Sequence, residues 1–139
     1  MTFPVDTMTS DPERRSVILV VEDVEETRDG IERLLTASGY QVSSARDEEE
    51  AVLKGSLCHP DLVLLGLGLD IFQVLPVATR IRDRTGLGEE VPVVVFCVTN
   101  LNEGAEVAVG YNVYMTRPDN FDQLRASLSR LLRKLSRSD

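Results

Sequence analysis

The sequence predicts a doubly wound α/β domain, in which helices cover both faces of a five-stranded parallel sheet. Short aliphatic and β-branched runs without polar alternation are typical of strands buried on both faces. Amphipathic segments of helical period separate these runs, and this alternation favours right-handed βαβ crossovers. The 139 residues suffice for one domain with a substantial core. Ligand or partner chemistry is expected beyond the carboxyl ends of the strands, at the switch point of the winding.

Five short runs are the predicted strands. The first, third and fourth runs are continuously apolar, the second is half-exposed and the last is short. Pro60 breaks the chain before the third run, and Pro92 belongs near the start of the fourth because proline has no N–H for the sheet ladder. The predicted strands are residues 16–21, 40–45, 61–67, 91–98 and 113–116.

Helices are predicted in the segments between and after these strands. Gly39 is placed to end the first helix in the left-handed conformation, and Asp47 with Glu50 resembles a capping box at the start of the second. Asp119 or Asn120 caps the last helix. The predicted helices are residues 25–38, a short acidic helix from 48 through 53, residues 71–85, a weak glycine-bounded helix at 103–109, and residues 121–136.

Apolar residues at helical spacing define the inward faces of three of these helices. The second and fourth helices carry a weaker pattern. The inward residues are Ile31, Leu34, Leu35 and Ser38 in the first helix, Val74, Ala78 and Ile81 in the third, and Leu124, Leu128, Leu131, Leu132 and Leu135 in the last.

Composition narrows the class of protein. The chain has 23 acidic and 15 basic residues and a formal charge of -8, which argues against a nucleic-acid or membrane-surface role. Cys58 and Cys97 form no CxxC motif, and the single histidine, His59, cannot build a metal centre alone. No signal-peptide or membrane-spanning run is present, so a cytoplasmic protein is expected, with residues 1–15 as a flexible leader.

Four stretches carry a resemblance to a known family: VILVVEDVEETR, HPDLVLLGLGL, VPVVVFCV and VYMTRPDNFDQL. In order and spacing, the chain from about residue 16 to residue 136 resembles the receiver domain of bacterial response regulators, which act in two-component and phosphorelay signal transduction. The resemblance implies a flavodoxin-like strand order of 2-1-3-4-5 and a single receiver-like domain over residues 16–139.

The resemblance also implies a site. In the family, an acidic pair after the first strand holds Mg²⁺, an aspartate ending the third strand accepts a phosphoryl group, and a hydroxyl, an aromatic residue and a Lys-Pro pair respond to it. Here the acidic pair is Glu22 and Asp23. The phosphoacceptor position is lost, because glycine has no nucleophile. The residue at the acceptor position is Gly66. The hydroxyl position is Cys97, the aromatic position is Tyr114, and the Lys-Pro pair is replaced by Arg117 and Pro118.

Two of these features have alternative interpretations. Glu22 and Asp23, with the Gly68 carbonyl, either form at most a weak Mg²⁺ site or are an inherited acidic patch that caps the next helix. Arg117 either reaches into the space left by the missing carboxylate and replaces Mg²⁺ beside the acids, or points to solvent.

Other residues near the predicted site have less chemistry to offer. Cys97 is expected to be a small buried hydrophobe rather than a redox switch. The Arg117–Pro118 bond matches a position that is cis in the family. Asp61 lies at the wrong end of its strand to replace the acceptor, and Asp70 would require a shift of register.

The predicted function is a non-enzymatic, phosphorylation-independent interaction module. A protein partner is expected on the face of the fourth helix, fifth strand and fifth helix, with Glu103, Glu106 and Tyr114, and a homodimer is left open. Tyr114 would be a fixed contact on that face. The alternatives are a phosphoaccepting regulator with displaced chemistry and a sensor of a small anion bound beside Arg117. Neither nucleic acid nor membrane is an expected partner, and no cofactor is expected beyond weak Mg²⁺.

Overall fold

The computed structural model describes the backbone of residues 15–96 and 98–137, and the side chains of 15–96 and 98–133. The predicted leader up to residue 14, Cys97 and the Leu135 side chain lie outside this part. The strands are β1 (Val17–Glu22), β2 (Gln41–Ala45), β3 (Leu62–Gly66), β4 (Val93–Val95), β5 (Glu106–Gly110) and β6 (Val113–Thr116). The helices are α1 (Glu25–Ala37), α2 (Glu48–Cys58), α3 (Ile71–Thr85) and α4 (Phe121–Arg137).

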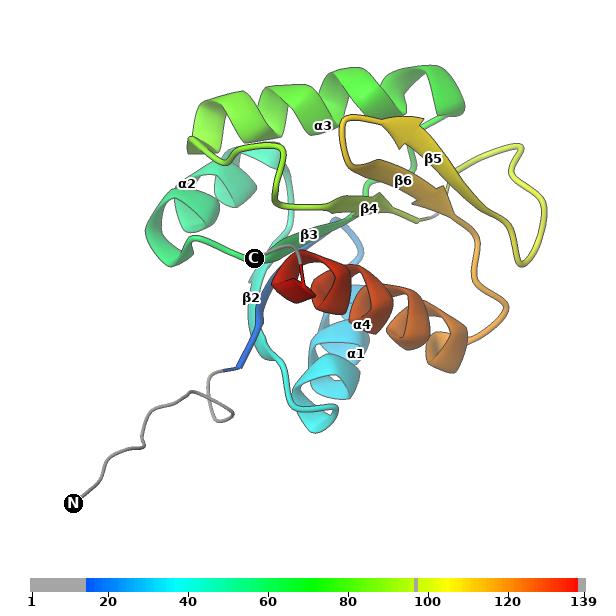
Figure 1. Ribbon diagram of the computed structural model, residues 1–139, viewed down its shortest axis with the longest axis horizontal. Coiled ribbons are helices and arrows are strands. Elements are labelled where there is room, and N and C mark those ends of the chain that lie inside the picture. Colours follow the sequence, from blue (N-terminus) through cyan, green and yellow to red (C-terminus); the bar gives the residue numbers. More distant parts are fainter. Residues whose placement is uncertain (1–14, 97, 138–139) are drawn as a thin grey trace.

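The sheet has the order β2-β1-β3-β4-β6-β5, and all neighbouring strands are parallel except β5 and β6. The five parallel strands therefore follow the predicted 2-1-3-4-5 order. The sixth strand, β5, is antiparallel and lies at the edge of the sheet (Figure 1). The α/β class is confirmed, but a strict five-fold βα repeat is wrong for this chain.

The predicted helix over residues 103–109 is wrong, because this segment forms β5 and a hairpin with β6. Its Glu-Val-Ala-Val sequence alternates with the period of a strand, and the flanking glycines leave too few residues for a stable helix. Gly110, Tyr111 and Asn112 all adopt positive φ values and form the turn. Glycine and asparagine tolerate this conformation well, so the turn chemistry favours a hairpin.

The helices form two layers, one on each face of the sheet (Figure 1). On one face, α2 and α3 cover a core cluster that includes Leu19, Val63, Val93 and Ile81. On the other face, α1 and α4 cover a second cluster that includes Leu64, Leu35 and Leu128. The strands are apolar on both faces because each face is buried under a helical layer.

Most predicted helix and strand boundaries agree with the structure. Asp47 caps α2 by accepting from the Glu50 N–H, while Glu50 accepts from Arg46 rather than completing a capping box with Asp47. Asn120 accepts from the N–H of Gln123 at the start of α4. Two expectations are wrong in extent: β4 is shorter than residues 91–98, and α2 extends past residue 53 to Cys58.

The inward face of α1 is narrower than predicted. Ile31 and Leu35 are buried, but Leu34 is 46% exposed and Ser38 is exposed as well. Ser38 lines a groove between the end of α1 and α4, so the two helices do not close over it. Gly39 has a φ of +100°, as expected for the residue that ends this helix.

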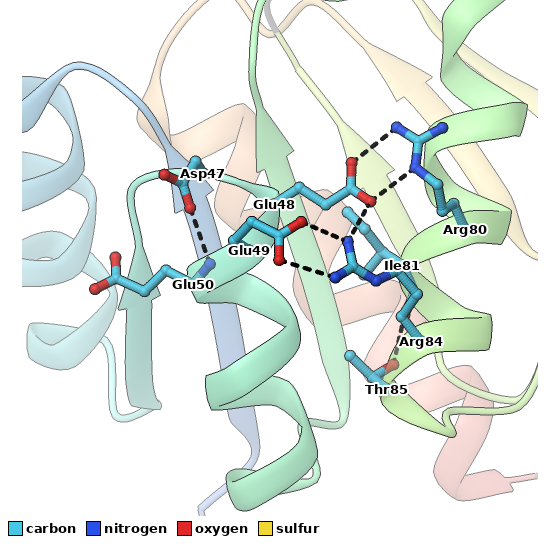
Figure 2. Close-up of polar contacts among 8 residues, drawn as sticks. All are labelled: Asp47, Glu48, Glu49, Glu50, Arg80, Ile81, Arg84 and Thr85. Atoms are coloured by element: carbon cyan, nitrogen blue, oxygen red, sulfur yellow. Dashed lines mark hydrogen bonds and ion pairs between the residues drawn. The ribbon is translucent and has the colours of Figure 1, made fainter.

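Ion pairs join α2 to α3 on the opposite face (Figure 2). Arg80 donates two hydrogen bonds to Glu48, at 2.7 and 2.8 Å, and Arg84 donates to both Glu48 and Glu49. These bonds lower the pKa of the Glu48 carboxyl, with the bond from Arg80 as the largest cause. The pairs are solvent-exposed, so they fix the register of the two helices more than they add stability.

A buried arginine attaches the hairpin to α3. Arg82 is 5% exposed, and its guanidinium donates to the carbonyl oxygens of Tyr111, Val91 and Asn112. This one side chain therefore satisfies backbone groups of the β5–β6 turn and of the segment before β4. None of the described helices combines the length and apolar character that crossing a bilayer requires.

Candidate functional site

The carboxyl ends of β1 and β3 bring Glu22 and Gly66 together at the predicted site. The two residues are direct partners in the parallel register. Glu22 ends β1 and Gly66 ends β3, so the two predicted positions meet at the switch point of the winding. Both residues are buried. The structure therefore brings these two predicted positions together, and their role in a site stays a prediction.

The ring of Phe96 fills the space beside Gly66. A Cβ atom added to Gly66 would lie 2.2 Å from Cζ and 2.6 Å from Cε1 of Phe96, and 2.6 Å from Oε1 of Glu22. Phe96 is 7% exposed, and its N–H donates to the Leu65 carbonyl at 2.8 Å, which holds its backbone against β3. The position where a phosphoacceptor side chain would begin is occupied by an aromatic ring.

Glu22 is a buried carboxylate with an incomplete set of partners. It is 3% exposed; Oε2 accepts from the Val24 N–H at 3.0 Å, and Oε1 has no hydrogen-bond partner. Burial raises the pKa of the Glu22 carboxyl, and the neighbouring Asp23 adds to the rise. The positive charge of Arg28 acts in the opposite direction and lowers the pKa of Glu22. The Arg28 guanidinium also donates to the Glu22 backbone carbonyl at 2.9 Å.

The residues of this site do not fit a Mg²⁺ ion. Oε1 of Glu22 lies close to Gly66, within 2.6 Å of where a Cβ atom would be, and the third carboxylate of the family is a glycine here. Asp23 and Gly68 are exposed, so they offer at most one carboxylate and one carbonyl. In residues 15–96 and 98–133, no three His, Cys, Asp or Glu side chains lie close enough to hold a metal. Mg²⁺ requires several oxygen ligands in near-octahedral array, which this set does not supply.

Arg117 does not lie where the hypothesis of a Mg²⁺ replacement needs it. Its side chain is exposed, and it donates to the Leu101 carbonyl at 2.9 Å. Its backbone forms hydrogen bonds with Ala105 and Gly104 in the segment that leads into β5. No peptide bond within the described residues is cis, so the expected cis bond before Pro118 is also wrong. Both differences accompany the hairpin, because residues 104 and 105 pair with Arg117 just before β5.

Tyr114 is held in place within the sheet. Its hydroxyl donates to Oδ1 of Asn112 at 2.8 Å, and its half-buried ring packs against the cluster beneath α4. It pairs with Val94 in β4 and Ala108 in β5. The adjacent Glu106 accepts from Ser127 of α4 at 2.7 Å and from Arg130. These contacts join β5, β6 and α4 into one continuous surface, whereas Glu103 lies on the exposed turn before it.

No neighbouring carboxylate takes the place of the missing one. Asp70 caps α3 and accepts from the N–H groups of Phe72 and Gln73, within a complete capping box. Asp61 accepts from the Val17 N–H at the start of β1, at the opposite end of the strands from Gly66. The exposed Asp23 is the carboxylate next to Glu22. Cys97 lies outside the described residues, and burial raises the pKa of the other thiol, Cys58.

Comparison with known proteins identifies the family. The model of the response regulator receiver domain matches residues 18–129, so the chain belongs to the receiver domain family of two-component signalling. It is 31% identical to the transcriptional regulatory protein KdpE of Staphylococcus aureus over 126 residues, covering 89% of this chain and 52% of KdpE. It is also 31% identical to the response regulator PhoP of Pseudomonas aeruginosa over 121 residues, covering 86% of this chain and 52% of PhoP.

The chain thus spans about half the length of these curated relatives. Among solved structures, the response regulator TrrA of Thermotoga maritima in complex with Mg²⁺-BeF has a TM-score of 0.60 and 24% identity, over 84% of this chain and 98% of that one. This similarity shows the fold alone, which is the flavodoxin-like receiver fold.

Sequence reasoning did not find Phe96, Arg28 or Arg82. The signal for Phe96 was a large aromatic residue at the end of one strand, beside a strand that ends in glycine. Such a pair is complementary in volume, but only the sheet register shows that the ring turns toward Gly66. Arg28 and Arg82 act on backbone carbonyls, and a sequence pattern carries no sign of these contacts.

Proposed function

We propose that this chain is a receiver domain that works without phosphorylation, as a protein-interaction module in two-component or phosphorelay-type signalling. The main support for this proposal is that Gly66 stands at the acceptor position and that the Phe96 ring packs against it. A phosphoryl group has no oxygen nucleophile to join there and no space to occupy. The poor fit of the acidic pair to Mg²⁺ supports the same proposal, because phosphoryl transfer depends on charge neutralisation.

The proposed contact face consists of β5, β6 and α4. It is a modified form of the face expected from the family, since a hairpin strand stands where the fourth helix was expected. Glu106 links β5 to α4, and Ala108 is exposed on the same strand. An open strand edge and an adjoining helix offer backbone and side-chain contacts to a partner chain. Because β5 has a neighbour on one side only, it is the natural position for such contacts.

The two alternative functions have weaker support. Displaced phosphorylation has less support, because Asp70 is engaged as a helix cap, Asp61 lies at the far end of the strands, and the exposed Asp23 belongs to a set of residues that fits Mg²⁺ poorly. A small-anion sensor has less support, because Phe96 fills the space beside Gly66 and Arg117 donates to a backbone carbonyl. Glu22 would also repel an anion there.

Chemical labelling tests the absence of phosphorylation. The purified chain is incubated with a small acyl phosphate and Mg²⁺, and its intact mass is measured before and after hydroxylamine treatment. We expect no hydroxylamine-labile phosphoryl adduct. A receiver with an aspartate at the corresponding position is the positive control. A stoichiometric adduct on this chain, located by peptide mapping, would overturn the proposal.

Affinity capture from the source cells tests the contact face. Proteins retained by the wild-type chain are compared with those retained by Ala108→Arg, which places a long charged side chain on exposed β5. The matched control is Leu57→Arg, at a residue of α2 that is 75% exposed on the other helical layer. We expect the specific partner to be lost with Ala108→Arg and kept with Leu57→Arg. Retention by both variants would exclude this face.

A further inference from the structure

A pocket of about 600 Å³ lies at the amino ends of β4 and β6, between α3, the loop before β4 and the β5–β6 turn. It is therefore at the opposite end of the sheet from Glu22 and Gly66. Its volume falls within the range of roughly 300–1,000 Å³ that is typical of ligand pockets. The residues that line it include Arg82 and Asp83 of α3, Leu87 and Glu89 of the loop, and Tyr111 of the turn.

Hydrogen bonds between the three segments hold the walls of this pocket together. The Arg82 guanidinium of α3 donates to the Tyr111 carbonyl of the turn, and the Asn112 side-chain amide donates to the Glu89 carbonyl at 2.9 Å. Figure 1 shows the loop and the turn beside α3, as these bonds require. The pocket is therefore formed by the fold itself, as most ligand sites are.

The rim of the pocket is acidic. Asp83 and Glu89 are exposed, and within the part of the chain that the structure describes neither carboxylate forms a hydrogen bond or an ion pair. The carboxylate of Glu90 lies against Gly88, where an added Cβ atom would be 2.2 Å from its Oε1. Neighbouring carboxylates repel each other unless a positive group joins them, so this rim favours a cationic ligand.

Arg82 adds a donor without a partner to the same pocket. It is 5% exposed, and its Nε is buried with no hydrogen-bond partner among the described residues. Burial lowers the pKa of the Arg82 guanidinium, while the negative charges of Glu89 and Glu90 act in the opposite direction. This guanidinium disfavours a bare metal cation, and the carboxylates disfavour a simple anion. The pocket therefore suits a ligand that carries both a cationic group and a hydrogen-bond acceptor.

We propose that this pocket binds an arginine side chain on an extended segment of a protein partner. The partner's guanidinium lies between Asp83 and Glu89, and its planar face stacks on the Tyr111 ring, which is 64% exposed. Leu87 contacts the aliphatic stem, and a main-chain carbonyl of the segment accepts from Nε of Arg82. Arginine fits better than lysine, because its flat fork binds carboxylates in bidentate fashion and stacks on aromatic rings.

This pocket goes beyond the proposed contact face of β5, β6 and α4, because it lies on the α3 side of the sheet. It also does not depend on the absence of phosphorylation, since no residue at the carboxyl ends of the strands takes part. Nucleic acid is disfavoured as its ligand, because phosphates would meet the carboxylates of the rim.

NMR titration of the isotope-labelled full chain tests the ligand class. The probe is the blocked peptide acetyl-Gly-Arg-Gly-amide, and the matched control is the same peptide with citrulline, which keeps the shape of arginine without its charge. We expect the arginine peptide to shift the backbone amides of residues 87–91 and 111–112, and the citrulline peptide to leave them unchanged. Free L-arginine should bind more weakly, because its carboxylate meets the acidic rim. Equal binding of the citrulline peptide, tighter binding of free arginine, or no shift at these amides would overturn the proposal.

Substitutions on the rim test the assigned contacts. Asp83→Asn and Glu89→Gln are each expected to weaken binding of the arginine peptide about fivefold, the scale of one exposed ion pair. Tyr111→Asn should weaken it as well, because asparagine tolerates the φ of +57° but has no ring. Asp29→Asn, at an exposed position of α1, and Ala108→Arg, on the other proposed face, should leave it unchanged. Unchanged affinity in both rim variants would overturn the proposal, whatever the fate of the β5 face.

Discussion

At the scale of single residues, Glu22 is a buried carboxyl with one unpaired oxygen. Its Oε2 accepts from the Val24 N–H, whereas Oε1 has no hydrogen-bond partner and lies within 2.6 Å of where a Cβ atom on Gly66 would be. Burial raises the pKa of the Glu22 carboxyl, because an ionised group with an unmade hydrogen bond is unfavourable in the interior. We therefore expect Glu22 to lower the free energy of unfolding at neutral pH.

Glu22→Gln is expected to stabilise the chain at neutral pH by about 1 kcal/mol, because the amide keeps an oxygen for the Val24 N–H and removes the buried charge. Because the folded pKa of Glu22 is raised, the folded state binds more protons than the unfolded state above pH ~4.5. Wild-type stability should fall as the pH rises through this window, and the variant should lack that fall. Denaturant unfolding from pH 4 to pH 8 measures it. Asp23→Asn, at an exposed position, is the control.

Gly66 and Phe96 form a complementary pair of small and large residues. Gly66→Asp is expected to destabilise the fold by about 1–3 kcal/mol through overpacking, and Phe96→Ala by about 3–5 kcal/mol through a cavity. The double variant should lose less than the sum of the two, because the new side chain enters the space that the ring leaves. A double-mutant cycle by denaturant unfolding measures this coupling. Additive losses would show that the two residues do not share this space.

At the scale of elements, the β5–β6 hairpin is the main departure from the expected fold. It depends on α3 through Arg82, whose guanidinium is the shared donor for three backbone carbonyls. It depends on α4 through Glu106, which contacts Ser127 and Arg130. The edge strand is therefore fixed from both helical layers, which explains how a short exposed strand keeps its position.

Arg82→Met keeps the buried aliphatic stem and removes the donors. We expect a loss of about 2 kcal/mol or more, because buried carbonyl groups lose their partner. The loss should appear first as faster amide hydrogen exchange in β5 and β6, measured by mass spectrometry, with β1 and β3 still protected. Arg33→Met, at an exposed position of α1, should leave both measurements unchanged. Uniform loss of protection across the sheet would contradict a local role.

The ion pairs between α2 and α3 should act weakly and with a defined pH dependence. The pKa of Glu48 is lowered in the folded chain, so its contribution is present above its unfolded pKa and is lost as the pH falls through the folded value. Glu48→Gln should lower the thermal midpoint slightly at pH 7 and leave it unchanged at acid pH. Glu103→Gln, on an exposed turn, is the control. An equal decrease at both pH values would assign the effect to packing.

At the scale of the whole molecule, the order of the parallel strands was predicted from the family resemblance, and most of the helices were predicted from the sequence pattern. The apolar runs of β1 and β3 are unambiguous, and their parallel register placed Glu22 next to Gly66 as expected. The segment of β5 was misassigned because the five residues between Gly104 and Gly110 fit both helical and strand periods. The positions of Phe96 and Arg117 depend on how the chain leaves β4 and enters β5, which is decided by tertiary packing and not by local pattern.

The Phe96 ring also has a consequence for how this domain can evolve. An aspartate gained at position 66 alone would collide with the ring, and a smaller residue gained at position 96 alone would leave an empty space in the core. Each single substitution passes through a less stable intermediate, so an aspartate at position 66 is separated from the present sequence by a barrier to stepwise substitution. Descendants of this chain are therefore expected to diversify on their outer surfaces while position 66 stays small.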